Sequence, residues 1–529
     1  MTPSAIAPGA GSDAWTEAEL LAALTASAPR CDGRVERHET HASWVFVLAE
    51  RAYKVKKPVA LGFLDYSTLS RRRAACREEV RVNRALAPDV YRGVRALVRD
   101  GDGLRLTDDG AVDAVDAVEY VVEMRAFSER ETFAGLIEAG DLRRADVADV
   151  ARTLANFHRH AAIDREWGPE RVLALWLHNL VELQRAEVPP RWRVDVALGF
   201  GRAFVHGRDS ALRERASRGL ARDGHGDLRC EHVLSRPVRI VDRIEFDAQL
   251  RRTDVAADLA FLAMDLEASD RRWAAEELYE TYRRTGLDIG EPWLRDFYAA
   301  HWALVRAKVA LIAASEHDGE QRATQLRIAE RLWRLSERLC WHARRPLAIV
   351  VCGPAASGKS VLAAALSQSS GAPVVSSDAV RKRLAGLEPT RRAGEAQYTE
   401  ASTHAAYAQL ARDARLALDE GGQVIVDATC RARREREPLL RSLRSTGARA
   451  LLVRCEVPLA LALQRAERRL GEAGRVSDAT PAIVERHYRE FEEPAAGEAD
   501  ATLRLDTAAP REAQLAEVAR AADHVLARA

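Results

Sequence analysis

The segment Gly353–Ser360 constrains the fold of this chain more than any other part of its sequence. Glycines stand at its first and sixth positions, and Lys359 and Ser360 follow the second glycine directly. The apolar run 347–352 precedes the segment, and the residues after it have the spacing of a helix. Glycines let backbone N–H groups curl around phosphate oxygens, and the helix N-terminus adds a favourable dipole. Strand, loop and helix together match the Walker A pattern, which predicts a phosphate-binding loop.

The residue types in this loop predict its ligand. Lys359 is placed to reach the β- and γ-phosphates of a nucleotide, and the Ser360 hydroxyl is placed to bind Mg²⁺. We therefore expect ATP and Mg²⁺ as cofactors of this part of the chain. The expected nucleotide contacts are Gly353, Ala355, Ala356, Ser357, Gly358, Lys359 and Ser360.

Residues 344–529 alternate between apolar runs and amphipathic segments. LAIVVCG, QVIVDAT and ARALLVRCEV have the composition of strands, and the stretches between them have helical spacing. Apolar strands that alternate with helices are typical of a parallel sheet covered on both faces. We therefore expect an α/β P-loop domain with a parallel sheet over 344–529.

Two acidic residues follow expected strands of this domain. Asp378 and Arg381 come after Val375-Ser-Ser, and Asp427 ends the run QVIVDAT. The segment around Asp378 resembles the zeta-toxin, polynucleotide-kinase and gluconate-kinase-like group of P-loop kinases. That resemblance implies that Asp378 activates the acceptor hydroxyl as general base and that Arg381 holds the acceptor; a helix cap is the alternative role of Asp378. Asp427 is a Walker-B-like candidate for the Mg²⁺ shell, with a turn-forming Asp as the alternative.

An arginine-rich helix is expected at PLALALQRAERRL. Arg465, Arg468 and Arg469 lie on it and resemble the arginine lid of the same kinases. Lid arginines neutralise charge on the transferring phosphoryl group, so Arg465 and Arg469 are expected to contact the nucleotide. An exposed helix face, on which arginine is common, is the alternative.

A second motif, His225-Gly226-Asp227-Leu228, stands before the run VRIVDRIEFD. It resembles the catalytic loop of aminoglycoside-phosphotransferase-like kinases, which are relatives of the protein kinases. The resemblance implies a second ATP site, with Asp227 beside the acceptor hydroxyl and Asp242 as a metal ligand. Glu245 and Asp247 are alternatives to Asp242.

A lysine pair upstream fits the same family. Lys54 and Lys56 alternate onto one face of the expected strand AYKVKKP. Comparison of the following Lys-Pro with the family favours Lys56 as the phosphate-binding residue, and Lys54 stays an alternative. Glu79, on the charged helix that follows, would be the partner that orients the lysine.

Two positions of the motif depart from the family. The family has Asn five residues after the catalytic Asp, where this chain has His232, and Arg229 replaces the family's second His. Histidine can bind a divalent metal, but it suits Mg²⁺ less well than an amide oxygen does. We therefore expect His232 as a metal ligand with a preference shifted toward Mn²⁺, or else a weakly active or inactive site.

The motifs divide the 529 residues into domains. The expected fold class is an α+β, protein-kinase-like, bilobal N-terminal domain followed by the α/β P-loop domain. The expected boundaries are a disordered tail at 1–14, an N-lobe at 15–125, a helical C-lobe with linker helices at 126–343, and the P-loop kinase domain at 344–529. The whole chain resembles bacterial proteins that fuse these two domains.

The composition of the chain argues against several kinds of partner and binding site. The 80 basic and 79 acidic residues leave a formal net charge of +1, which argues against nucleic acid as a partner. The 7 cysteines stand singly, without a CxxC pair that would suggest a zinc site. The N-terminus lacks the pattern of a signal peptide, and an 18-residue apolar run is missing, so we expect a cytoplasmic protein without a membrane partner. Nothing in the sequence indicates a protein partner.

The function expected from these observations is ATP-dependent transfer of a phosphoryl group to the hydroxyl of a small molecule, such as a sugar or amino sugar. Two alternatives remain open at this point. One domain could be a nucleotide-sensing pseudokinase that regulates the other, which His232 favours. The C-terminal domain could instead phosphorylate polynucleotides or nucleotide sugars, which the balanced charge disfavours.

Overall fold

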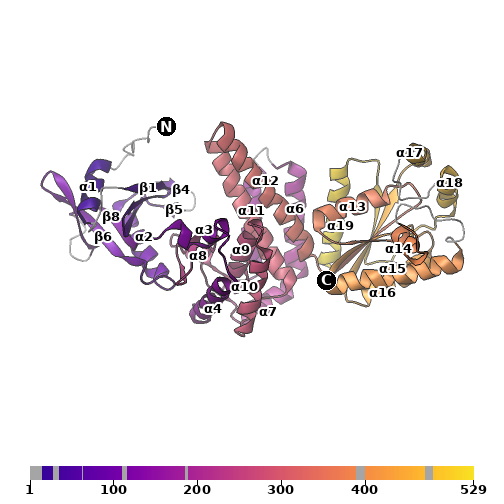
Figure 1. Ribbon diagram of the computed structural model, residues 1–529, viewed down its shortest axis with the longest axis horizontal. Helices are drawn as coiled ribbons and strands as arrows, with labels where there is room; N and C mark the ends of the chain where they lie inside the picture. Colours follow the sequence, from indigo (N-terminus) through magenta and orange to yellow (C-terminus); the bar gives the residue numbers. More distant parts are fainter. Residues whose placement is uncertain are drawn as a thin grey trace. The chain divides into compact units, whose positions relative to one another are not determined.

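The computed structural model describes residues 15–27, 35–61, 64–109, 116–184, 189–388, 399–470 and 480–528, and the expected tail 1–14 lies outside them. The chain divides into two compact units (Figure 1). The first unit comprises Met1–Trp167 and Arg215–Ile289, and the second comprises Gly168–Glu214 and Gly290–Ala529.

The first unit begins with a six-stranded antiparallel sheet. In spatial order its strands are β1 (Glu36–Glu39), β2 (Ser43–Leu48), β3 (Arg51–Lys56), β8 (Ala117–Arg125), β6 (Tyr91–Asp100) and β7 (Gly103–Asp108). Each face of the sheet has its own apolar core: α1 (Glu17–Ser27) packs on one face, and α2 (Leu69–Asn83) packs on the other. Successive strand residues point to opposite faces, so Lys54 and Lys56 share the face that α2 covers.

The rest of the first unit is mainly helical. Its longer helices are α4 (Arg144–His160), α9 (Val255–Ala268) and α10 (Arg272–Arg284), with the shorter η2 (Glu129–Glu131), α3 (Phe133–Glu138), η3 (Cys230–His232) and α8 (Ala248–Arg251). The strand pairs are β4 (Ala60–Leu61) with β5 (Leu64–Asp65), β9 (Ala221–Asp223) with β12 (Arg252–Asp254), and β10 (Val233–Leu234) with β11 (Arg239–Ile240). Nearly every residue of α9 is buried, so this helix forms the centre of the helical part.

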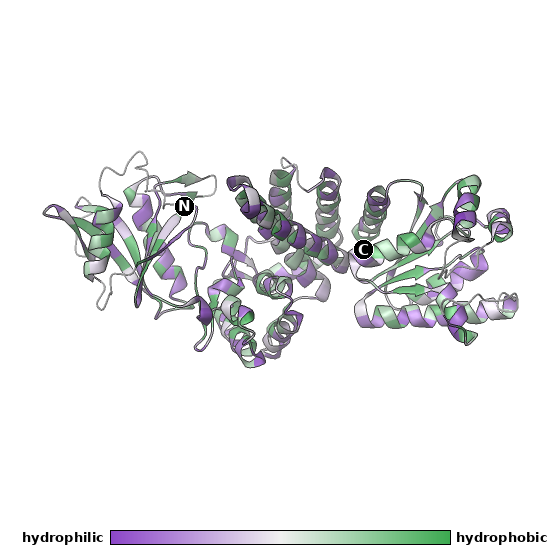
Figure 2. Cartoon of the chain, turned by 45° about the horizontal axis from the view of Figure 1, so that its top comes forward, coloured by the Kyte–Doolittle hydropathy of each residue, from purple (hydrophilic) through white to green (hydrophobic). Residues whose placement is uncertain are grey.

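A five-stranded parallel sheet forms the centre of the second unit. Its spatial order is β14 (Val374–Ser376), β15 (Gln423–Asp427), β13 (Leu347–Cys352), β16 (Arg449–Glu456) and β17 (Ala501–Asp506). Every residue of β13 is buried, as expected for a central strand covered on both faces. Figure 2 shows these strands in the green of hydrophobic residues.

Helices cover both faces of this sheet (Figure 1). One face packs against α14 (Ser377–Leu384), α15 (Glu400–Gly421) and α16 (Arg433–Arg444). The other face packs against α13 (Lys359–Ser370) and α19 (Arg511–Ala527). A smaller core joins α17 (Leu459–Leu470) and α18 (Pro481–Glu490) to Ala355 and Ala356, so these two helices pack beside the phosphate-binding loop.

The second unit also contains helices that we expected to complete the kinase-like C-lobe. These are α5 (Pro169–Leu183), α6 (Arg191–Gly207), α11 (Pro292–Glu316) and α12 (Gly319–Ala343), while α7 (Asp209–Ser217) contains the boundary between the units. Trp176, Phe200, Phe204 and Phe297 form an aromatic cluster among them. Because α6 packs against α19 of the P-loop part, these helices cluster with that part, and the seam at 344 does not separate the two compact units.

Arg344 joins α12 to the P-loop part. Its guanidinium stacks on Phe200 and Trp341, with distances to the ring centroids of 4.5 and 4.6 Å. The same group donates to Asp523 Oδ1 on α19 at 2.8 Å, and both side chains are buried. A buried ion pair between these elements makes their packing specific, because either charge alone would be costly to bury.

In the part of the chain that the structure describes, one helix, α11, is long and apolar enough to cross a membrane by length and composition alone. The core helix of a globular protein has the same pattern, and 56% of the relevant window of α11 is buried inside the protein.

Candidate active sites

The phosphate-binding loop has the backbone that its sequence predicts. Gly353, Ala356 and Gly358 have positive φ values of 141°, 61° and 92°. A Cβ atom at Gly353 would lie 2.8 Å from the carbonyl oxygen of Cys455, and one at Gly358 would lie 3.1 Å from the Thr507 side chain. A side chain at either position would therefore displace the loop. With glycine at both positions, the inner surface of the loop is lined by backbone atoms.

Side chains of the loop are placed for a nucleotide. The Lys359 amine donates to the carbonyl of Pro354 at 2.8 Å, so the lysine lies across the loop. The Ser357 hydroxyl is buried and has no hydrogen-bond partner among the described residues. Ser360, in the first turn of α13, is exposed. Backbone N–H groups at a helix N-terminus, a lysine and a hydroxyl fit the phosphates of a nucleotide with its Mg²⁺.

Asp427 lies beside this loop. It is the last residue of β15, in register with Val351 of β13 on one side and Ser376 of β14 on the other. Its side chain is buried. Because parallel strands end at the same edge of a sheet, this register places Asp427 at the edge where the loop leaves β13.

Asp378 and Arg381 lie one turn apart on α14. The N-cap of this helix is Ser376, so Asp378 is in the first turn and is not the N-cap residue. Asp378 is half-buried, and Arg381 is buried and donates to the Thr403 hydroxyl at 3.3 Å. Residues three apart share a face of a helix, so the two side chains lie on the same side of α14.

The arginine-rich helix is α17. Arg465 donates to the carbonyl oxygen of Thr507 at 2.9 Å and to its hydroxyl at 3.2 Å. The Thr507 hydroxyl in turn donates to the carbonyl of Ser357 at 2.7 Å, so Arg465 supports the phosphate-binding loop through Thr507. Arg468 is exposed, and the side chain of Arg469 lies outside the described part of the structure.

His487, on α18, was missed by sequence reasoning. Its Nδ1 is buried and has no hydrogen-bond partner in the described part of the chain. Burial, together with the positive charges of Lys359 and Arg431, lowers the pKa of His487 to about 4. A neutral imidazole therefore lies near the P-loop lysine. The sequence carried no signal for it, because only the fold brings residues this far apart together.

In the first unit, Glu79 lies between the two lysines of β3. Its Oε1 is 2.8 Å from the Lys54 amine, and its Oε2 is 2.6 Å from the Lys56 amine. Lys56 is almost fully buried and also contacts Glu245, whose carboxylate accepts from the Tyr66 hydroxyl at 2.9 Å. Lys54 is more exposed, and its second partner is Asp242, at 2.7 Å.

The three candidates for the metal-binding carboxylate, Asp242, Glu245 and Asp247, have different surroundings. The Asp247 side chain accepts from the backbone N–H of Gln249 at 2.7 Å, as the N-cap of α8. Glu245 is held by Lys56 and Tyr66. Asp242 has a positive φ of 61° and a side chain that is 44% exposed, and the Lys54 amine holds the pKa of its carboxyl well below the usual range. Among the three, Asp242 is the carboxylate that neither caps a helix nor is held by Lys56 and Tyr66.

The segment that carries Asp227 is held by Asp258 of α9. Asp258 accepts from the backbone N–H groups of His225 and Gly226 at 2.6 and 2.9 Å, and its Oδ2 lies 3.0 Å from His158. Burial lowers the pKa of His225 to about 4, and its Nε2 donates to the carbonyl of Val241 at 2.9 Å. These contacts fix the backbone around Asp227, whose side chain is 30% exposed.

His232 lies against the same loop. Its Nδ1 is 2.7 Å from the carbonyl oxygen of Asp227, and its Nε2 is 3.6 Å from Asp242 Oδ2. The Nε2 atom is also 3.1 Å from Nη2 of Arg229. The structure thus brings together Asp227, His232 and Asp242, as the motif predicted, and adds Arg229 to them.

Among the residues that the structure describes, neither site forms a complete metal cage from protein side chains. No group of three or more His, Cys, Asp or Glu side chains that could hold a metal occurs within the ranges that the structure describes. At the phosphate-binding loop, Ser360 and Asp427 fit a Mg²⁺ ion that takes its other ligands from phosphates and water. At the first site, Asp242 offers a carboxylate of the same kind.

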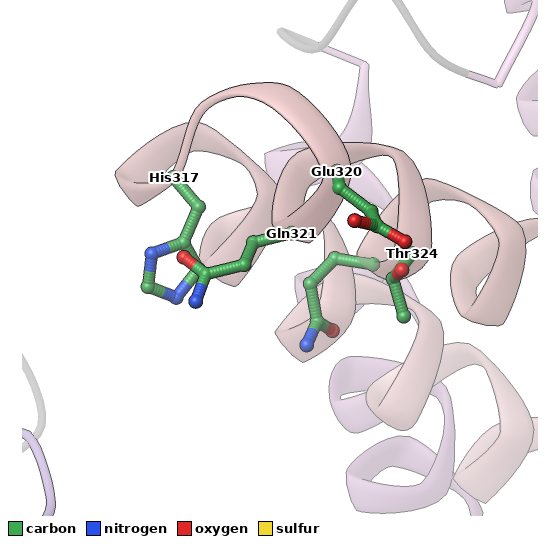
Figure 3. Close-up of a pocket in the computed structure, with 5 residues that line it drawn as sticks. His317, Glu320, Gln321 and Thr324 are labelled. Atoms are coloured by element: carbon green, nitrogen blue, oxygen red, sulfur yellow. The ribbon is translucent and has the colours of Figure 1, made fainter.

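A separate hollow lies at the turn between α11 and α12. Its lining is polar and consists of His317, Glu320, Gln321, Thr324 and Gln325. Figure 3 shows His317, the C-cap of α11, beside Gln321, and shows Glu320 beside Thr324, which lies four residues later on α12. The strand β13 follows the other end of α12, which is about 37 Å away along a helix of this length. This hollow therefore does not belong to the nucleotide site at the phosphate-binding loop.

Comparison with protein families supports the assignment of the second unit. Residues 349–494 match a family model described as an AAA domain. Two solved structures are also similar in part. A gluconokinase from Sinorhizobium meliloti 1021 is 23% identical with a TM-score of 0.25, over 35% of this chain and 94% of its own. A choline/ethanolamine kinase family protein from Mesorhizobium loti is 15% identical with a TM-score of 0.35, over 60% of this chain and 98% of its own. Both TM-scores lie below 0.5, so the functions in these names say nothing of this chain.

Two proteins of Mycobacterium tuberculosis are similar over nearly the whole chain. Rv2004c (strain ATCC 25618 / H37Rv) and MT2060 (strain CDC 1551 / Oshkosh) are each 32% identical over 493 residues, which is 90% of this chain and 93% of theirs. The family model and the parallel sheet confirm the P-loop fold predicted for the C-terminal part. The identity over nine-tenths of its length shows that this chain belongs to the same family as the mycobacterial protein Rv2004c.

Proposed function

We propose that this protein is an ATP-dependent phosphotransferase with two nucleotide sites, which transfers the γ-phosphoryl group to a hydroxyl of a small molecule such as a sugar or amino sugar. One observation carries the proposal: Asp427 ends β15 in register with Val351, two residues before the phosphate-binding loop, and with Ser376, the end of the strand that leads into Asp378. A nucleotide cradle with two nearby carboxylates has the parts that metal-assisted transfer to an alcohol requires.

The roles at the P-loop site follow from this geometry. The backbone of Gly353–Gly358 and the Lys359 amine bind the phosphates, and Ser360 with Asp427 would hold Mg²⁺. When bound, Mg²⁺ would neutralise charge on the phosphates. Asp378 accepts the proton of the acceptor hydroxyl as general base, and Arg381 on the same face of α14 orients the acceptor. Arg465 acts indirectly, because it holds the loop through Thr507.

In the N-terminal site we give the phosphate-binding role to Lys54 and not to Lys56. The Lys54 amine contacts both Glu79 and Asp242, and its side chain is 13% exposed against 2% for Lys56. A lysine that is held by the helix glutamate and the metal carboxylate is positioned for a nucleotide phosphate. The Lys56 amine is enclosed by Glu79 and Glu245, so its role is structural. Asp227 is the proposed base at this site.

One structural observation favours a second candidate function. The Nε2 atom of His232, which would bind metal, accepts a hydrogen bond from Arg229. An N-terminal domain without a complete metal site would bind nucleotide without turning it over, and would then regulate the P-loop site. No comparable observation supports phosphorylation of polynucleotides by the P-loop domain, and the balanced net charge argues against it. We also propose that the protein acts in the cytoplasm.

Consumption of ATP across a panel of acceptors tests the proposal. The panel contains sugars, amino sugars, nucleosides and RNA ends, and each is tested with wild type, Lys359→Ala and Asp227→Ala. We expect an alcohol acceptor to accelerate ATP consumption, with Lys359→Ala removing the activity of one site and Asp227→Ala that of the other. If Asp227→Ala changes nothing while Lys359→Ala removes all turnover, the N-terminal domain is the nucleotide sensor.

A further inference from the structure

Arg229 is a fixed cation in the centre of the N-terminal site. Its Nε lies 3.1 Å from Asp227 Oδ1, and its Nη1 contacts Glu231. Burial lowers the pKa of Arg229, but the carboxylates of Asp227 and Glu231 outweigh burial and raise it. The side chain is 20% exposed, so the guanidinium lies largely within the site and not in solvent.

The hydrogen bonds of His232 show which of its nitrogens could bind a metal. The carbonyl of Asp227, 2.7 Å from Nδ1, can only accept, so Nδ1 carries the ring proton. The lone pair of the neutral ring is then on Nε2, and this is the atom that a metal would use. A guanidinium can only donate, so Nη2 of Arg229, at 3.1 Å, already takes this lone pair.

The position of a second metal is therefore filled by a guanidinium. A second divalent ion would need ligands from Asp242 and from the position of His232. Arg229 lies against the Nε2 atom of His232 and the carboxylate of Asp227, and so fills this place. Arginine is always charged, and its planar fork matches two oxygens of a phosphoryl group. It can thus neutralise the charge that a second metal ion neutralises in related transfer sites.

We propose that Arg229 takes the place of a second divalent metal ion in the N-terminal site, so that nucleotide binds there with one metal ion, held by Asp242. The inference rests on the proposed function, because a phosphoryl group is the ligand that needs the charge. It replaces the expectation that His232 is a metal ligand: His232 orients Arg229 and fixes the loop at Asp227.

Metal stoichiometry tests this directly. Binding of Mn²⁺ is measured by electron paramagnetic resonance with a non-hydrolysable ATP analogue, in a Lys359→Ala background that silences the other site. We expect about one Mn²⁺ per chain in the background protein and in Arg229→Lys, which keeps the charge, and about two in Arg229→Gln. The double variant Arg229→Gln/His232→Asn should also bind two, whereas His232→Asn alone should bind one, because Arg229 still fills the position.

Arg252→Gln is the matched control, since it removes the same charge at an exposed position of the same unit. It should leave the stoichiometry at about one. Two nucleotide-dependent Mn²⁺ ions with Arg229 intact would overturn the inference, even if the Arg229 variants failed to fold. One ion in both Arg229→Gln proteins would overturn it as well. No nucleotide-dependent Mn²⁺ in any variant would refute the N-terminal nucleotide site itself, and with it the inference.

Discussion

The Lys54 amine lies 2.7 Å from the Asp242 carboxylate, although 188 residues separate the two in the sequence. Lys54 is on β3 and Asp242 follows β11, so this contact joins the sheet of the first unit to its helical part. The neighbouring Lys56 has no such contact and is buried against Glu79 and Glu245. Two lysines two positions apart thus share Glu79 but differ in their second partner, so their substitutions should have different effects.

Lys56→Met should reduce the stability of the protein, whereas Lys54→Met should reduce nucleotide binding. Loss of the Lys56 amine leaves Glu245 and one oxygen of Glu79 buried without their cation, which should cost about 3 kcal/mol in the free energy of unfolding. Lys57→Met is the control, because Lys57 pairs with the half-exposed Glu39 and should contribute about 1 kcal/mol or less. Urea denaturation and titration with an ATP analogue measure the two effects. Unchanged stability of Lys56→Met would contradict the structural role.

Asp378→Asn should slow phosphoryl transfer and leave ATP affinity nearly unchanged. The substitution removes the proposed general base while keeping the size of the side chain, and such losses lower turnover by about 10²–10⁴-fold. Asp419→Asn, an exposed change on α15, is the control and should have no effect. Turnover and ATP affinity are measured on the same preparations. A collapse of ATP affinity with normal turnover would place Asp378 in the metal shell.

The buried side chain of His301 should make the free energy of unfolding of the second unit decrease as the pH is lowered. Burial lowers its pKa to about 4, from the 6.5 of an exposed histidine. As pH falls below 6.5, the unfolded chain takes up the proton first, so stability is lost between pH 6.5 and pH 4. At pH 5 the loss from this residue alone is about 2 kcal/mol. His301→Gln should flatten the dependence of unfolding free energy on pH, and the exposed control His206→Gln should not. An unchanged slope in His301→Gln would contradict the assignment.

Arg344→Ala should destabilise the P-loop part even though the residue is outside the nucleotide site. The substitution leaves the Asp523 carboxylate buried without its cation and removes the stacking on Phe200, which together should cost about 3–5 kcal/mol. Thermal unfolding with and without nucleotide measures the effect. Equal melting temperatures of variant and wild type would show that the contact between α12 and α19 does not contribute to stability.

The sequence predicted the parts of the fold that depend on local pattern. The glycine spacing in Gly353–Ser360 predicted a phosphate-binding loop, and the two glycines have the positive φ angles that such a loop needs. The alternation of apolar runs and amphipathic segments after residue 344 predicted the parallel sheet. The period of a strand also placed Lys54 and Lys56 on the face that α2 and Glu79 cover. Each of these predictions needs only neighbouring residues.

Other features depend on tertiary packing and could not be predicted in this way. The spacing of α11 and α12 predicts helices but not their partners, such as the pairing of Arg344, at the end of α12, with Asp523 of α19. The choice between Lys54 and Lys56 depends on where Asp242 and Glu245 lie after folding. The role proposed for His232 depends on the conformation of the loop, which brings the Arg229 guanidinium within 3.1 Å of the ring; spacing alone does not predict it.

Equilibrium titration with a non-hydrolysable ATP analogue and Mg²⁺ tests the claim that one chain holds two nucleotide sites. We expect wild type to bind about two nucleotides, Lys359→Ala and Lys54→Met to bind about one each, and the double variant to bind none. Circular dichroism on each protein shows that the variants are folded. A wild-type stoichiometry of about one, lost entirely in Lys359→Ala and unaffected in Lys54→Met, would contradict the claim and leave the P-loop as the sole nucleotide site.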